Sequence, residues 1–357
     1  MRPPTLDGKR LPLLKFFEYG RWQVRPDELE ILKPSIQLAS NIVRVGMPYI
    51  ASFLPQRDDM FKNVDFYDED GNRASLCPEE ILLKENPSKD GVAAALEALE
   101  NLASSIRWQT NYEMWSTSTG EDETMDWMGV TRLVDKPRPW GIISPEQIAE
   151  ADTQSMKDEL DYRPLVIGIM GEYVNAIRNS PRTSEQHSRA VFMAAITMVH
   201  EVGHAVFHQD FRSYNPPTLE EPYVGKGCSR ELGIAFITWI FDGFHPIGTK
   251  LHSHSLTDFT AHLSWVQHYT MDIDRRPPYK TLYSISVQYI VEKLTQEWWD
   301  TLPSPAELID FSSKAKAGLK PITDPDSSQT ATARETEWVY SWWAGCATWK
   351  SEFDFRK

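Results

Sequence analysis

The sequence predicts an α+β fold in which helices predominate. Most of the chain beyond residue 150 carries apolar residues at the three- and four-residue spacing of amphipathic helices. Shorter apolar segments between residues 104 and 143 are separated by polar turns, which is typical of strands. A chain of 357 residues is long enough to bury a large core in one or two domains. We expect a helical or irregular N-terminal region, residues 1–105, and a larger domain, residues 106–357.

The first half of the chain is expected to hold both helices and strands. Prolines interrupt the first 60 residues, which contain only short apolar stretches. Residues 88–107 have the pattern of an amphipathic helix, whose apolar face carries Val92, Leu96, Leu99 and Leu102. Short strands are expected within 104–119, 129–134 and 140–143.

The second half is expected to be helical. A helix begins at Ser144-Pro145-Glu146, because serine is a good N-cap and proline suits the first helical position. Apolar stripes predict further helices near 153–179, 184–209, 229–242, 256–269, 284–299 and 334–350.

Charge and cysteine content limit the partners. Lys and Arg number 37 against 51 Asp and Glu, and the net charge of -14 argues against binding to a phosphate backbone, so we expect no nucleic-acid partner. Three separated cysteines, an odd number, suit free thiols in a reducing compartment: Cys77, Cys228 and Cys346. Residues 1–21 lack a continuous apolar core, and no run of about 18 apolar residues is evident. We therefore expect a cytoplasmic protein without a membrane partner.

The most informative segment is His200-Glu201-Val202-Gly203-His204, an H-E-x-x-H motif inside an apolar helix-forming run. This spacing puts two imidazoles on one helical face about one turn apart, where both can reach a single metal ion. Three ionisable groups in an apolar segment are costly unless something pairs them. The motif therefore predicts a metal site rather than two ordinary half-buried histidines.

The motif and its flanks resemble those of the zincin superfamily of zinc-dependent hydrolases. In these enzymes the motif is preceded at the third position by Val or Thr, as Thr197 is here, and its intervening positions are uncharged, like Val202 and Gly203. The resemblance implies bound Zn²⁺ and a zincin-like fold: a small sheet, then the active-site helix near 184–209, then a helical C-terminal subdomain. It also implies that a strand within 128–143 forms the upper rim of a substrate cleft.

A catalytic zinc takes three protein ligands and a water, so a third ligand is needed. His208 lies about 12 Å from His200 along a straight helix, too far for both to bind one ion. Asp210 stands where the metzincin branch has its ligand, but Phe207 replaces the glycine that this branch needs to turn the chain. Glu231, 27 residues beyond His204 at the start of a second helix, resembles the ligand of the gluzincin branch. We favour Glu231.

Glu201 is expected to be the general base. It points about 100° around the helix from His200 and can take a proton from a metal-bound water that attacks a carbonyl. A further donor must stabilise the oxyanion of the tetrahedral intermediate. Six downstream side chains are candidates for this donor: His252, His254, His262, His268, Tyr283 and Tyr289.

The sequence thus predicts a zinc metallohydrolase, a peptidase acting on a peptide or another amide-containing substrate. Two alternatives remain open. The same helix could serve a metal-dependent biosynthetic enzyme, including a non-haem iron oxygenase, since two histidines and a carboxylate also form the facial triad of those enzymes. The chain could also be a non-catalytic binding protein with a zincin-like helix.

Overall fold

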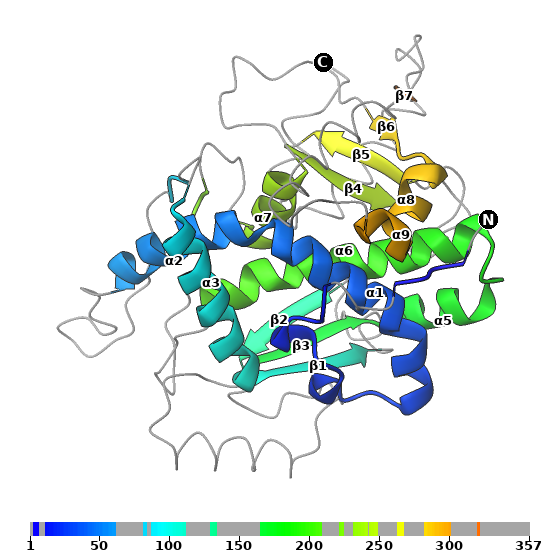
Figure 1. The fold of residues 1–357 in the computed structure, drawn as a ribbon, viewed down its shortest axis with the longest axis horizontal. Helices are drawn as coiled ribbons and strands as arrows, with labels where there is room; N and C mark the ends of the chain where they lie inside the picture. Colours follow the sequence, from blue (N-terminus) through cyan, green and yellow to red (C-terminus); the bar gives the residue numbers. More distant parts are fainter. Residues whose placement is uncertain are drawn as a thin grey trace, which may run out of the picture.

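The structure is a computed structural model. It describes residues 3–6, 11–61, 81–83, 87–111, 129–133, 165–208, 221–224, 231–241, 243–248, 263–267, 282–300 and 320–321. Within these residues the fold is α+β and mostly helical, as the sequence predicts. Figure 1 shows the long helix α6, Glu185–His208, running through the middle of the molecule, with a sheet on each side of it.

The first sheet contains β1, Ile106–Asn111, β2, Gly129–Leu133, and β3, Leu165–Met170. The strand order is β1-β3-β2, with β1 parallel and β2 antiparallel to β3. Strands β1 and β2 lie within segments predicted as strands. The helix predicted near 153–179 is wrong at β3, since the helix α5, Gly171–Asn179, begins only after this strand. All six residues of β3 are buried, so the strand lacks the alternation that reveals a half-buried strand in a sequence.

The helices that precede the first sheet in the chain pack on α6 and on one another. Helix α1, Pro26–Val45, begins with a proline at its first position and packs along α6; α2, Met47–Phe61, follows it closely. Helix α3, Lys89–Leu102, begins at Ser88, whose hydroxyl accepts a hydrogen bond from the Gly91 amide. It ends five residues before the predicted end at 107, because β1 starts at Ile106. Three short 3₁₀ helices complete this part: η1, Lys15–Phe17, η2, Tyr19–Arg21, and η3, Ala103–Ser105.

The chain after α6 combines short helices with a second sheet. Helix α7, Leu232–Ile240, packs on α6, and α8, Val287–Lys293, and α9, Gln296–Asp300, follow later. Four antiparallel strands form the sheet β4-β5-β6-β7: Phe244–Gly248, Leu263–Gln267, Leu282–Ser284 and Lys320–Pro321. The predicted helix 256–269 is therefore wrong at β5, where Leu263 and Trp265 are buried two residues apart. The C-terminal part is not purely helical.

Some sequence predictions lie outside the described residues. These are the strand 140–143, the helix start at Ser144-Pro145-Glu146, the helical segments 153–164 and 334–350, and the three cysteines Cys77, Cys228 and Cys346.

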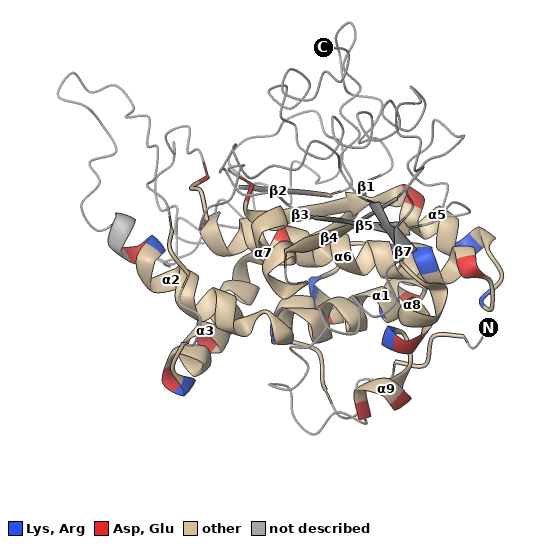
Figure 2. Ribbon diagram, turned by 90° about the horizontal axis from the view of Figure 1, so that it is seen from above, with Lys and Arg blue, Asp and Glu red and all other residues tan. Residues whose placement is uncertain are grey.

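One continuous cluster of buried apolar residues, from Leu14 to Trp299, joins the helices before and after α6. The predicted division at residue 105 stays a prediction. By length and composition the segment Glu185–Phe207 of α6 could cross a membrane, but 89% of its most apolar part is buried inside the protein, as in a core helix. In Figure 2 the charged residues of the described part lie mainly on outer helices such as α2, α3, α5 and α9.

Candidate metal centre

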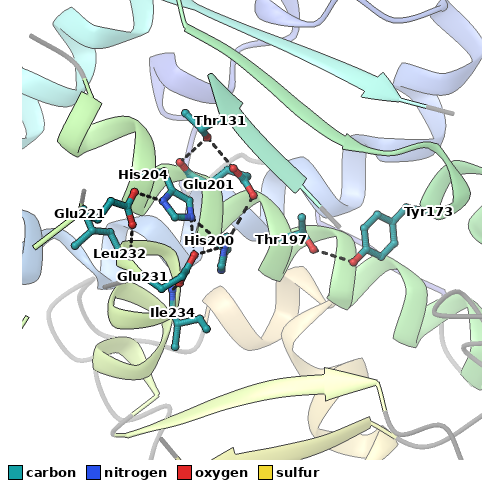
Figure 3. A network of polar contacts seen from close by, with 10 residues as sticks. All are labelled: Thr131, Tyr173, Thr197, His200, Glu201, His204, Glu221, Glu231, Leu232 and Ile234. Atoms are coloured by element: carbon teal, nitrogen blue, oxygen red, sulfur yellow. Dashed lines mark hydrogen bonds and ion pairs between the residues drawn. The ribbon is translucent and has the colours of Figure 1, made fainter. Parts of the chain in front are cut away.

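Helix α6 presents the two motif histidines side by side. His200 and His204 are one turn apart, and their Nε2 atoms lie 3.1 Å from each other. Both rings are partly accessible, with 15% and 17% of their side chains exposed. The residues around them on the helix, including Val199 and Val202, are fully buried. The helix therefore holds the two rings against an apolar support, with both Nε2 atoms turned toward Glu231 (Figure 3).

Glu231 meets both histidines from helix α7. It is the N-cap residue of α7, and its Oε2 accepts a hydrogen bond from the Ile234 amide. Its other oxygen, Oε1, lies 3.0 Å from His200 Nε2 and 2.7 Å from His204 Nε2. The structure thus brings together the three residues that the sequence predicts as metal ligands.

Two glycines permit this close approach of α6 and α7. A Cβ atom on Gly203 would lie 2.6 Å from the carbonyl oxygen of Leu232, and a Cβ on Gly233 would lie 2.5 Å from His200 Cδ2. Both distances are shorter than van der Waals contact, so a larger residue at either position would push the helices or the ring away. The absence of side chains at these positions is what lets Glu231 reach His200.

Glu201 lies beside the histidines but on the side of the first sheet. Its side chain is 2% exposed. Thr131 of β2 donates a hydrogen bond of 2.7 Å to Glu201 Oε2, while Glu201 Oε1 lies 4.0 Å from His200 Nε2. Gly129, also in β2, lies so close that a Cβ there would be 2.4 Å from Glu201 Oε1. The strand therefore covers Glu201 and orients its carboxylate, which is not one of the three clustered donors.

A second contact anchors the same part of α6. Thr197, one turn before His200, pairs its hydroxyl with that of Tyr173 in α5 at 2.8 Å, as Figure 3 shows. Both side chains are buried. Thr197 also lies against Gly129, because a Cβ on that glycine would be 2.8 Å from Thr197 Cγ2. Thr197, three residues before the motif, thus packs between α5 and β2.

Glu221 belongs to the cluster and was not predicted. Its Oε1 lies 2.5 Å from His204 Nδ1, and its Oε2 accepts a hydrogen bond of 2.8 Å from the Leu232 amide at the start of α7. The signal in the sequence is weak: Glu221 is one of two adjacent glutamates before a proline, in a segment without periodicity. Acidic residues in such segments are usually exposed to solvent.

The three glutamates share one arrangement. Each uses Oε2 to accept a hydrogen bond from the surrounding fold, from Thr131, Leu232 or Ile234, and turns Oε1 toward the histidine pair. Three acidic groups around two imidazoles leave an excess of negative charge in a mostly buried space, which a divalent cation would offset.

The charges of the cluster also shift the pKa values of its own residues. Burial by itself lowers the pKa of His204, but the carboxylates of Glu221 and Glu231 outweigh it and hold that pKa well above its usual value. Burial raises the pKa of Glu231, yet His200 and His204 together hold it well below its usual value. For Glu201, burial dominates and raises the pKa, with His200, His204 and Thr131 acting in the opposite direction. The position between the histidines and Glu231 thus favours positive charge.

The distances also fit a zinc ion. Donor atoms that bind one Zn²⁺ at about 2.0–2.1 Å in tetrahedral geometry lie roughly 3.3 Å apart. The three donors here lie 2.7, 3.0 and 3.1 Å apart, so shifts of a few tenths of an ångström suffice. Two histidines and one glutamate are also a common ligand set of catalytic zinc.

Among the proposed oxyanion donors, Tyr289 has a described side chain. This side chain is buried and packs against Phe192, which precedes His200 by eight residues and hence lies about 12 Å from it along α6. These contacts place Tyr289 in the apolar core, and its role as the oxyanion donor stays a prediction. Tyr283 lies in β6, paired with Trp265, and its side chain is outside the described part. The four histidine candidates fall outside the described residues: His252, His254, His262 and His268. Asp210, the other candidate for the third metal ligand, also lies outside them.

No known protein family, characterised protein or solved structure matches this chain. The chemistry that this site can perform therefore rests on its own geometry.

Proposed function

We propose that this chain is a zinc metallohydrolase of the zincin type, a peptidase that cleaves amide bonds. In this proposal His200, His204 and Glu231 hold the metal, and Glu201 is the general base. The observation that carries it is the convergence of three donor atoms, two imidazole Nε2 and one carboxylate Oε1, within 3.1 Å of one another. A second carboxylate, the buried Glu201, lies beside them.

The roles of the residues follow from their contacts. Zn²⁺, when bound, lowers the pKa of a coordinated water toward neutrality and polarises the carbonyl group of the substrate. Glu201 accepts a proton from the water as the water oxygen attacks the carbonyl carbon, and the same carboxyl group then delivers that proton to the leaving nitrogen. Thr131 keeps one Glu201 oxygen occupied, so the other oxygen, nearest to His200, is the one that exchanges protons.

The neighbouring strand supports a peptide as substrate. In the described sheet β2 pairs with β3 on one side only, and it contacts α6 next to Glu201. An edge strand at this position can bind an extended peptide through backbone hydrogen bonds, the role that the resemblance to zincins assigns to a strand within 128–143. This would hold the scissile amide near Glu201.

The same donor set is compatible with iron, which is the alternative worth testing. Facial-triad iron enzymes use two histidines and one carboxylate, usually on a β-barrel, whereas here the three residues come from α6 and α7. Metal analysis of the protein purified without added metal separates the two: zinc supports the hydrolase, and iron with dioxygen consumption supports the oxygenase.

The decisive test is the Glu201→Gln variant. Glutamine preserves the shape of the side chain but cannot accept the proton. We expect cleavage of a fluorogenic peptide library to fall by about 10²–10⁴-fold while zinc content stays at the wild-type level. Glu185→Gln is the matched control: the same change on the same helix, at an exposed carboxylate that pairs with Arg189 in the first turn of α6, far from the metal centre. Undiminished cleavage by Glu201→Gln would refute the mechanism.

A further inference from the structure

Glu221 joins the two elements that build the metal centre. Its Oε1 accepts a hydrogen bond from His204 Nδ1, on helix α6, and its Oε2 accepts one from the Leu232 amide, at the first position of helix α7. Leu232 directly follows Glu231. One carboxylate therefore contacts both a histidine of the cluster and the helix start that presents the glutamate of the cluster, as Figure 3 shows.

We propose that Glu221 is a positioning residue of the metal centre, an inference that rests on the metal site of the proposed function. By accepting the Nδ1 proton, Glu221 keeps His204 in the tautomer whose Nε2 lone pair faces Glu231 Oε1. By accepting the Leu232 amide, it keeps the start of α7 at the distance from α6 at which Glu231 reaches both imidazoles. A carboxylate behind a metal-binding histidine also increases the basicity of the ring.

The geometry excludes a direct ligand role for Glu221. Its carboxylate lies at Nδ1, whereas the clustered donors are the Nε2 atoms on the other side of the imidazole ring. Both carboxylate oxygens are already engaged, one with His204 and one with Leu232. Glu221 therefore acts on the metal through His204 and Leu232 and not as a ligand.

The surrounding fold holds Glu221 in place. The Ile81 amide donates a hydrogen bond of 2.8 Å to the carbonyl of Tyr223, and Ile81 forms a parallel bridge with Val224. The next residue, Leu82, is bound through both its backbone amide and its carbonyl to the side chain of Gln56 in α2. The short segment 221–224 is thus tied to a helix early in the sequence, which gives the Glu221 side chain a defined origin.

The test measures zinc affinity by competition with a chromophoric chelator, using the full chain and Zn²⁺ alone. We expect Glu221→Ala to bind zinc about 10–100-fold more weakly than the wild type. The zinc affinity of Glu221→Gln should lie between those of the wild type and Glu221→Ala. The single amide oxygen of glutamine can accept a hydrogen bond from His204 Nδ1 or from the Leu232 amide, but not from both. Val224→Ala is the matched control: it shortens a side chain in the same segment without touching the cluster and should change affinity less than about twofold.

A spectroscopic readout separates positioning from general support of the fold. In zinc-loaded protein labelled with ¹⁵N-histidine, the wild type should show His204 bound to the metal through Nε2 and a slowly exchanging proton on Nδ1. Glu221→Ala should lose the slow exchange of that proton, and Glu221→Gln should retain part of it. Wild-type binding through Nδ1 of His204 would overturn the inference without any variant.

The failures of the two proposals are distinguishable. If wild-type protein binds zinc through the predicted ligands and Glu221→Ala binds it equally well, only the role of Glu221 is wrong. An equal loss in Val224→Ala would likewise overturn that role, because it would reflect loosening of the segment. If His204→Ala leaves wild-type zinc affinity unchanged, the metal site itself is wrong, and the role of Glu221 goes with it.

Discussion

Helix α6 carries two histidines whose environments invite comparison, His187 near its start and His204 near its end. In both rings the Nδ1 atom has a polar partner on another part of the chain. His187 Nδ1 lies 3.2 Å from the carbonyl oxygen of Ile177 and 3.5 Å from the hydroxyl of Ser180, both neutral groups. His204 Nδ1 instead meets the carboxylate of Glu221, and its Nε2 meets Glu231.

The difference reverses the effect of burial. Burial lowers the pKa of His187, and its neutral hydrogen-bond partners only partly counter this. At His204 burial acts in the same direction, but two carboxylates outweigh it and raise the pKa. A buried histidine on a helix is thus a neutral packing residue in one case and a candidate cation site in the other. The presence or absence of neighbouring acidic groups sets which of these two roles a buried histidine has.

The largest expected effect comes from removing a ligand. His204→Ala should weaken zinc binding by about 10³-fold, because it removes one of the three proposed protein ligands to an ion that such sites hold by about 10–16 kcal/mol. His187→Ala should leave zinc affinity unchanged, since no acidic partner of His187 is found among the described residues. Chelator competition measures both. Similar zinc affinities in the two variants would show that His204 is no more a metal ligand than His187.

The next effect concerns Gly203, the residue before His204, where α7 approaches α6 closely. Gly203→Ala should destabilise the protein by about 1–3 kcal/mol, because the new Cβ would collide with backbone at Leu232. Gly20→Ala is the control, since a Cβ there meets nothing within 4 Å. Urea unfolding gives both values. If the two variants are equally stable, α6 and α7 do not pack as closely as the structure shows.

A smaller effect should follow from changing Thr131, the hydrogen-bond donor to Glu201. Thr131→Val removes the hydroxyl with little change of volume and should lower peptide cleavage about tenfold, because Glu201 loses its orientation. Thr131→Ser keeps the hydroxyl and should restore most of the activity. Zinc affinity should stay the same in both variants. A serine variant as impaired as the valine variant would show that the hydroxyl is not what matters.

The smallest effect is the pH dependence contributed by His187. Its pKa is lowered in the folded protein, so below about pH 6.5 the unfolded chain binds a proton more readily, and stability falls as the pH decreases. The slope is at most about 1.4 kcal/mol per pH unit for one proton. His187→Gln should lose this contribution, so the stability advantage of the wild type should shrink between pH 7.5 and 5.5. An advantage that stays constant would contradict the assignment.

The predictable parts of the fold are those governed by local periodicity. Helix α6 spans Glu185–His208 against a predicted 184–209, because its apolar pattern continues over six turns. The strand β3 was missed because it is buried on both faces and reads as a continuous apolar run joined to the next helix. The strand β5 was missed because its alternation covers only five residues, Leu263–Gln267.

The sequence by itself determined the pair of histidines and the carboxylate next to them, since a helical repeat of 3.6 residues sets their relative directions. It also favoured Glu231, through the resemblance to the gluzincin branch, whose third ligand is a glutamate on a downstream helix. Only the tertiary structure decided that Glu231 reaches both imidazoles and that Glu221 stands behind His204. These contacts join segments that lack any shared period, and they depend on two glycines between helices and on a backbone pairing with Ile81.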